Sequence, residues 1–127
     1  MDFQISEDQR RLQQRCRELA ADFATRSGEH DRDGSHPSEN YDILRREGFC
    51  GLNIPKKFGG MGHGLLGHTL AFEALGQGCP STALSFNMHL SITGPLMTSA
   101  AVPDETKQMV ARLAVEERKL IAGNFSE

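Results

Sequence analysis

The stretch that decides the fold is residues 46–64, REGFCGLNIPKKFGGMGHG, because it separates two helical halves of the chain. A short extended piece, CGLNIP, is followed by KKFGGMGHG, which ends in a glycine-rich run: Gly59, Gly60, Gly62 and Gly64. Glycine loses more backbone entropy on folding than any other residue, so such a run disfavours both helix and strand. We therefore expect a turn-rich connection here.

Before this stretch, the pattern predicts one long helix and one short helix. Ser6 and Gln9 match a capping box, in which each side chain bonds the backbone N–H of the other. The helix that they start covers residues 7–25 and places its apolar side chains on one face: Leu12, Cys16, Leu19, Ala20 and Phe23. Residues 26–37, RSGEHDRDGSHP, are polar and predict a loop. Ser38 can cap the shorter helix, which Gly48 ends.

After this stretch, three more helices are expected. Residues 65–78 have a broad apolar face and end in glycines. Pro80 fits the first turn of a fourth helix that runs to about residue 97. This helix is apolar on more than one face, which predicts a central position. Pro103 starts a fifth helix, and residues 119–122, KLIA, predict the start of a strand.

The predicted fold class is therefore all-α: a five-helix orthogonal or up-down bundle, with the start of a β-strand at its C-terminal end. Residues 1–118 form the helical domain, and residues 119–127 are the first strand leading into a β-rich domain that this sequence does not include. A single strand cannot satisfy its own backbone hydrogen bonds, so we expect β structure to follow.

Composition limits the classes of function. Lys plus Arg total 14 and Asp plus Glu total 17, a formal net charge of −3 that provides no overall basic field for nucleic acid. No apolar run approaches the ~20 residues of a membrane span, and the N-terminus lacks the pattern of a secretory signal. The three cysteines lack disulfide or zinc-site spacing: Cys16, Cys50 and Cys79. We expect a cytoplasmic protein with no nucleic-acid partner.

The residues alone predict no catalytic residue and no metal site. Residues 62–67 match the pattern GxGxxG, but Pro55 and a long turn stand where a dinucleotide site needs a strand. A glycine turn that opens a helix is therefore favoured. His63 and His68 are poorly placed to share one helical face, so they do not suggest a metal site.

Two polar residues on apolar helices leave alternatives open. His89, in the fourth helix, is interpreted as a core histidine with satisfied hydrogen bonds, and the alternative is a residue that lines a cavity. Glu73 is interpreted as part of a structural ion pair or as an exposed helix edge. The alternative for Glu73 is a catalytic base, which would need a partner group that is not evident nearby in sequence.

Four segments, in order, carry a resemblance to a known family: MDFQISEDQRRLQQRCRELAADF, REGFCGLNIPKKFGGMGHG, FEALGQGCPSTALSFNMH and PDETKQMVARLAVEERKLIAGNFSE. Together they resemble the N-terminal helical domain of the acyl-CoA dehydrogenase family, over essentially the whole sequence. The most specific part is the leucine, proline, aromatic and Gly-Gly-x-Gly pattern, here Leu52, Pro55, Phe58 and residues 59–62.

The resemblance implies a five-helix domain that the family follows with a β-barrel-like domain and a C-terminal four-helix bundle. FAD and the acyl-CoA thioester lie between the three. In the family, a glutamate of the C-terminal domain removes the α-proton while the β-hydrogen passes as hydride to the flavin. That base is absent from this sequence, so the resemblance implies an inactive chain on its own. It also implies electron-transferring flavoprotein or another acceptor as partner, and a homo-oligomer at full length.

The resemblance also implies site residues. The strand that ends this domain in the family meets the flavin, and the matching positions here are Phe125 and Ser126. The family lines its acyl pocket from the fourth helix, here with four residues whose spacing places them on one face: Leu84, Asn87, Met88 and Ser91.

Two other functions remain open. A flavin-dependent monooxygenase shares this fold, and Gly123 departs from the family pattern next to the flavin positions. A non-catalytic helical binding module would have a polar outer surface on the last two helices. A domain of a larger enzyme would instead expose an apolar patch where other domains pack.

Overall fold

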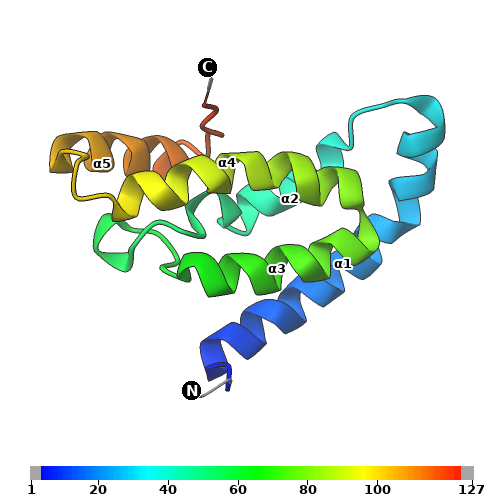
Figure 1. Ribbon diagram of the computed structural model, residues 1–127. Coiled ribbons are helices and arrows are strands. Elements are labelled where there is room, and N and C mark those ends of the chain that lie inside the picture. The colour runs from blue at the N-terminus through cyan, green and yellow to red at the C-terminus, as the bar shows by residue number, and fades with distance from the viewer. Residues whose placement is uncertain (1–3, 124–127) are drawn as a thin grey trace.

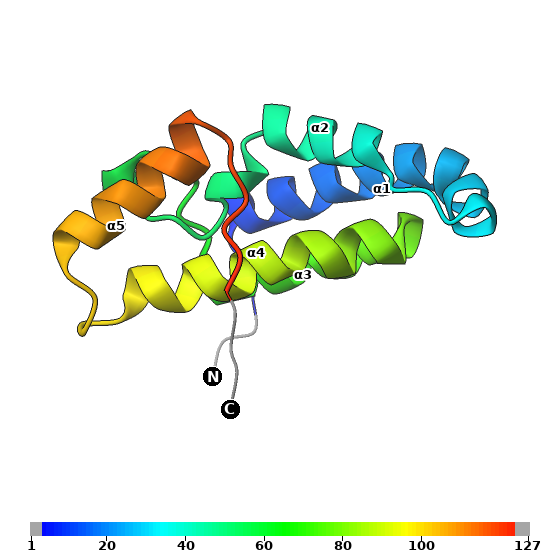
Figure 2. The same cartoon turned by 90° about the horizontal axis from the view of Figure 1, so that it is seen from above.

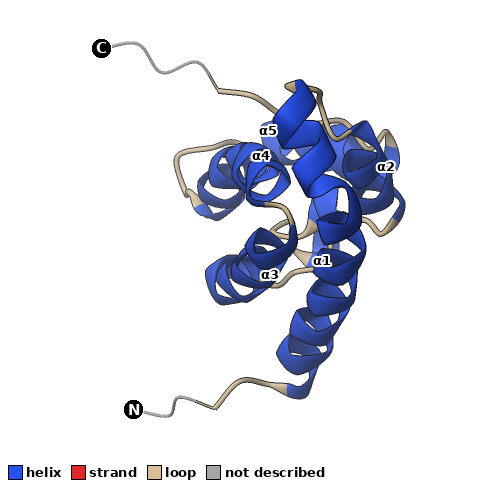
Figure 3. Cartoon of the chain, turned by 90° about the vertical axis from the view of Figure 1, so that its right-hand side faces the viewer, coloured by secondary structure: helices blue, strands red, loops and turns tan. Residues whose placement is uncertain are grey.

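The computed structural model describes residues 4–123 and contains five α-helices and no strand within that range (Figure 3). The helices are α1 (Glu7–Asp33), α2 (Ser38–Arg46), α3 (Gly64–Gly78), α4 (Pro80–Thr98) and α5 (Asp104–Ala111). Short 3₁₀ turns, η1 (Phe49–Gly51) and η2 (Lys56–Phe58), lie between α2 and α3, and a π-helical turn, η3 (Arg112–Glu116), follows α5. The predicted all-α class is confirmed.

The packing order differs from the chain order. α1 packs mainly against α3, and α3 packs against α4, which lies beside it (Figure 1). α2 contacts α4 and η1, and α5 with η3 closes one end of the domain. α4 therefore touches elements from both halves of the chain, as its apolar composition predicted.

Helix α1 begins as predicted and ends later than predicted. Ser6 Oγ accepts from the Gln9 backbone N–H at 3.2 Å, and Gln9 Oε1 accepts from the Ser6 N–H at 2.9 Å. The loop predicted for residues 26–37 is wrong over residues 26–33, which remain helical. The last turns bury no apolar residue, so the hydrophobic pattern gives no signal there. They are held by polar contacts, among them Arg26 Nε to Asn40 Oδ1 at 2.7 Å, until Gly34 ends the helix at φ +61°.

The glycine-rich connection folds back on the CGLNIP segment. The backbone N–H groups of Met61 and Gly62 donate to the carbonyls of Gly51 and Ile54, each at 2.9 Å. Gly60 lies so close to this segment that an added Cβ would stand 2.1 Å from the Ile54 carbonyl oxygen. Only glycine fits there. The turn predicted from sequence is therefore a tight one, and it leads directly into α3.

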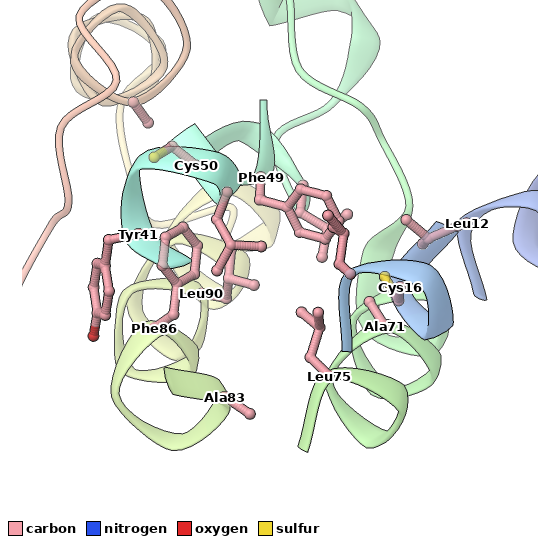
Figure 4. Packing of buried hydrophobic residues seen from close by; sticks show 14 of the residues in the cluster. Leu12, Cys16, Tyr41, Phe49, Cys50, Ala71, Leu75, Ala83, Phe86 and Leu90 are labelled. Carbon is pink, nitrogen blue, oxygen red and sulfur yellow. The ribbon is translucent and has the colours of Figure 1, made fainter. Parts of the chain in front are cut away.

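The core lies between α1, α2, α3, α4 and the segment around η1 (Figure 4). Its largest fully buried apolar side chains come from all of these: Phe23, Leu44, Phe49, Leu52, Ile54, Leu75, Phe86 and Leu90. α1 and α3 approach closely at one crossing, where a Cβ added to Gly78 would stand 2.0 Å from the Ala20 carbonyl oxygen.

The predicted strand at residues 119–122 does not form within the described residues. Instead, the chain turns at Arg118, whose φ is +54°, and residues 119–123 pass over α4 without regular structure (Figure 2). A strand needs a neighbouring strand to accept its N–H groups. Here the N–H of Ile121 finds a side chain instead, His89 Nδ1 at 2.8 Å. The remainder of the predicted strand, residues 124–127, lies outside the described residues.

Candidate functional site

The four residues predicted to line an acyl pocket share α4 but have different environments. Leu84 and Met88 are exposed, with 69% and 59% of their surface accessible. Asn87 is partly buried against α3, and Ser91 is exposed at the edge of a cavity. The predicted flavin residues, Phe125 and Ser126, lie outside the described residues.

The cavity lies between the start of α3 and the second half of α4 and has a volume of about 430 Å³. That size falls within the range of small-molecule sites. Nine residues line it: Asn53, Gly64, Leu65, His68, Leu90, Ser91, Gly94, Pro95 and Thr98. The lining contains no Asp, Glu, Lys or Arg, so the cavity suits a largely neutral group.

A hydrogen-bonded cluster of Asn53, His68 and Asn87 connects the cavity lining to α4. Asn53 Nδ2 is 3.3 Å from the Leu90 carbonyl oxygen, a contact that only the nitrogen side of the amide can make favourably. The same Nδ2 is 3.3 Å from His68 Nδ1, which must therefore be the acceptor. His68 Nε2 then carries the proton and donates to Asn87 Oδ1 at 2.5 Å. The cluster thus fixes the orientation of the His68 ring, with Nδ1 toward Asn53 and Nε2 toward Asn87.

The cluster leaves one buried atom unpaired. Asn53 Oδ1 has no hydrogen-bond partner among the described residues. Asn53 reaches α4 because position 94 is glycine, where an added Cβ would stand 3.0 Å from Asn53 Nδ2. Sequence analysis did not single out Asn53. The signal that could have found it is an amide side chain inside the otherwise apolar GLNIP segment.

Backbone groups add polarity to the cavity walls. α3 has no side chain that caps its start, so no cap occupies the first-turn N–H groups of Gly64 and Leu65. On the opposite wall, the Ser91 carbonyl lacks the usual helical hydrogen bond from position 95, because Pro95 has no N–H. The Ser91 hydroxyl donates to the Asn87 carbonyl at 3.0 Å, which leaves its oxygen lone pairs as acceptors. The cavity can therefore offer both donors and acceptors.

His89 does not line this cavity. It is 3% exposed, and both ring nitrogens are used: Nε2 donates to the Cys50 carbonyl at 2.7 Å, and Nδ1 accepts from the Ile121 N–H. Burial lowers the pKa of His89. The interpretation as a core histidine with satisfied hydrogen bonds is confirmed. Glu73 is exposed on α3, which agrees with the exposed-edge interpretation.

Large apolar side chains remain exposed on α3, α4 and α5. They are Leu65 and Leu66 at the start of α3, Leu84 and Met88 on α4, and Met109 on α5. Leu84 and Met88 are four residues apart and so share one face of α4. We call these two residues the apolar face of α4. Exposed apolar side chains that share a face are typical of a surface that binds a ligand or packs on another domain.

Other kinds of site find no support in the described part of the chain. Among residues 4–123, no group of three or more His, Cys, Asp and Glu side chains is placed to hold a metal ion. No strand precedes residues 62–67 there, so the GxGxxG pattern is the glycine turn that opens α3. No described helix is long and apolar enough to cross a membrane.

Comparison with known proteins agrees with this architecture. Residues 6–117 match the sequence model of the acyl-CoA dehydrogenase N-terminal domain. The chain is 33% identical to an acryloyl-CoA reductase (NADH) of Anaerotignum propionicum over 71% of its own length and 23% of that protein. It is 30% identical to a putative acyl-CoA dehydrogenase of Bacillus subtilis over 84% of its own length and 28% of that protein.

A third relative has a different reaction in its name. This 3-sulfinopropanoyl-CoA desulfinase of Paraburkholderia xenovorans is 28% identical over 89% of the chain and 29% of that protein. The chain thus spans about a quarter of the length of these relatives. The family match covers nearly all of the helical structure, with its glycine turn and central helix. The chain therefore belongs to the acyl-CoA dehydrogenase family, as an N-terminal domain.

Proposed function

We propose that this chain is the N-terminal domain of an FAD-dependent acyl-CoA dehydrogenase and that α4 forms one wall of its acyl site. The observation that carries this proposal is the apolar face of α4, Leu84 and Met88, exposed on the helix whose second half lines an uncharged cavity, in a domain of this family. A non-catalytic binding module would instead have polar surfaces on α4 and α5, where Leu84, Met88 and Met109 are exposed.

The acyl site that we propose has two parts with different roles. Leu84 and Met88 provide apolar surface along α4 for a hydrocarbon chain. Asn87 and Ser91 lie on the side of α4 that faces α3 and the cavity, where hydrogen bonds to His68 and to the helix backbone hold them in place. In this arrangement, the apolar pair binds the substrate and the polar pair fixes the shape of the wall.

The uncharged cavity favours a neutral acyl group. An anionic group, such as the sulfinate named in one relative, would lose its hydration without gaining a cationic partner from the nine lining residues. A dehydrogenase whose CoA thioester substrate carries an uncharged acyl group is therefore favoured over a reaction at a charged acyl end.

The cofactor part of the proposal rests on family membership. FAD, when bound, would supply the hydride acceptor. The described residues supply apolar surface and positioned hydrogen-bond groups, and we propose no proton transfer through them. Phe125 and Ser126 are the residues that we expect to contact the flavin. Acyl-CoA is the proposed substrate, electron-transferring flavoprotein or another acceptor the proposed electron partner, and a homo-oligomer the proposed assembly.

The test uses the complete protein that carries this chain. Its flavin absorbance is recorded anaerobically while CoA thioesters with uncharged acyl groups of increasing chain length are added. We expect bound flavin, bleaching by at least one thioester, and no bleaching by a thioester with an anionic end. A Leu84→Asp substitution should raise the concentration needed for bleaching about tenfold or more, because the bound hydrocarbon chain would then cover a charge in place of apolar surface. Absence of flavin, or no bleaching by any thioester, contradicts the proposal.

A further inference from the structure

Three segments that are distant in sequence meet at the side chain of His89. The residue belongs to α4, its Nε2–H donates to the carbonyl of Cys50 in η1, and its Nδ1 accepts from the N–H of Ile121 after η3. The two distances, 2.7 and 2.8 Å, are those of well-formed hydrogen bonds. One ring therefore connects α4, η1 and the segment that follows η3.

The orientation of the His89 ring is fixed from several sides. One nitrogen must donate and the other must accept, so only the neutral tautomer with the proton on Nε2 serves both contacts. The ring of Phe86 packs edge-on against it, with centroids 6.0 Å apart. The Thr93 hydroxyl donates to the main-chain carbonyl of His89 at 3.1 Å, a bond to the helix backbone and not to the ring.

The segment that follows η3, residues 119–123, has few other anchors. Lys119 N–H donates to the Leu113 carbonyl, which closes the turn behind it. Cys50 Sγ lies 3.6 Å from the Arg118 carbonyl oxygen, a weak contact one residue earlier. Lys119 Nζ also pairs with Glu117 Oε2 at 2.5 Å, and Leu120 and Ile121 pack partly buried against the core. The Ile121 N–H thus donates to a side chain, His89 Nδ1, where in a sheet it would donate to the backbone carbonyl of a neighbouring strand.

We infer that His89 is a positioning residue, which fixes the path of the main chain where it leaves the helical domain. This inference rests on the proposed function in one respect, namely that the next residues meet the flavin. Phe125 follows Ile121 by four residues, which can span at most about 14 Å. A main chain fixed at Ile121 therefore limits where Phe125 and Ser126 can reach, and the imidazole acts on the flavin site only through them.

The experiment compares three substitutions in the complete protein. His89→Leu removes both hydrogen bonds, whereas His89→Gln keeps one donor and one acceptor. Thr93→Val is the matched control, since it removes a buried hydroxyl from the same helix without touching Ile121. The first measurement is hydrogen exchange of the Ile121 amide, and the second is the dissociation constant of FAD.

We expect His89→Leu to speed exchange at Ile121 about tenfold and to weaken FAD binding by a similar factor. His89→Gln should change the Ile121 exchange rate and the FAD dissociation constant much less than His89→Leu does. Thr93→Val should leave both quantities near wild type. Unchanged exchange at Ile121 in His89→Leu overturns the inference. So does faster exchange with unchanged FAD binding, because the positioning role is then absent. If wild type binds no FAD, the proposed function fails, while the exchange result still decides whether His89 fixes the chain.

If His89→Leu does not fold, Ile121→Pro gives the same test from the other side. Proline removes the N–H donor and leaves the His89 ring in the core. We then expect faster exchange at residues 120 and 122 and weaker FAD binding. Unchanged values of both would overturn the inference.

Discussion

Two buried asparagines, Asn40 and Asn53, bond to the same helix, α4, but only one of them is fully paired. Asn40 Oδ1 accepts from Arg26 at 2.7 Å, and its Nδ2 donates to Thr82 Oγ1 at 2.9 Å. Asn53 makes longer bonds, each 3.3 Å, and its Oδ1 is unpartnered among the described residues. The paired asparagine lies in the core between α1, α2 and α4, whereas the other lines the cavity.

This difference separates a fully satisfied polar network from a partly satisfied one. A buried polar group that is fully satisfied stabilises one packing arrangement, while a partly satisfied one costs free energy. The network at Asn40 continues through Thr82, whose hydroxyl donates to Cys79 Sγ at 3.1 Å. It therefore joins three helices. The cluster at Asn53 gives up stability at the wall of an uncharged cavity.

The largest effect is expected from Asn40→Ala. This substitution leaves Arg26 and Thr82 without their partner in the core, and we expect it to lower the free energy of unfolding by about 3 kcal/mol. Chemical denaturation of the variant and of wild type measures this loss. A loss below about 1 kcal/mol would mean that the network at Asn40 is no more important than a surface contact.

The second prediction concerns the thiol at the end of the Asn40 network. Burial raises the pKa of Cys79, but hydrogen bonds from Ser81 and Thr82 outweigh burial and lower the pKa to about 7, from 9.0. The unfolded state then holds its proton to higher pH than the folded state does. The free energy of unfolding should therefore rise from pH 7 to 9, by up to about 2 kcal/mol, and lose this contribution as pH falls through 7.

Denaturation of Cys79→Ala across this pH range tests that prediction, since the variant should lack the rise. Cys16→Ala is the matched control. Burial raises the pKa of Cys16 to about 12, so in the folded state this thiol stays protonated through the range and adds no rise in the free energy of unfolding. An equal rise in wild type and Cys79→Ala would show that Cys79 is not the group responsible.

A smaller effect is expected from Asn53→Ala. The substitution removes two long hydrogen bonds but also one unpaired buried oxygen, so the net loss should be about 1 kcal/mol. The substitution should also remove the contact of Asn53 with His68 Nδ1. A change in the NMR shifts of the His68 ring would detect this loss, whereas denaturation would not. A loss as large as that of Asn40→Ala would remove the distinction between the two networks.

The smallest effect is expected from Gly94→Ala. Alanine favours the helix by about 1 kcal/mol, but its Cβ would stand 3.0 Å from Asn53 Nδ2 and push the amide away. We expect these effects to offset each other in denaturation. Gly76→Ala in α3 is the control, because its Cβ meets only Ala83 at 3.8 Å and should show the full gain. An equal gain at both positions would show that Asn53 does not need the space at Gly94.

Local patterns made most of the fold predictable. The capping box at Ser6, the proline at the start of α4 and the glycines before α3 each act within a few residues, and each was located from sequence. The extension of α1 to Asp33 was missed because polar contacts with Asn40 and other residues of later segments hold its last turns. The strand at residues 119–122 was predicted from composition, but an N–H group bonds to whichever acceptor lies near it, here His89.

The candidate site was predictable in part. Helical spacing placed four residues on one face of α4, and the structure divides them between an apolar surface and the edge of the cavity. The cluster of Asn53, His68 and Asn87 could not be read from spacing, because its members are 15 and 19 residues apart and lie on three elements. Such contacts exist only after α3 and α4 have packed.

The link between α3 and α4, a single residue, also has a consequence for the order of folding. Cys79 alone joins the two helices, so their contacts close shorter loops than those of α1 with α3, which span all of α2 and the glycine-rich connection. Short loops cost less chain entropy to close and form sooner. We expect the α3–α4 hairpin to form first in time, with the cavity walls already facing each other when α1 docks and completes the core.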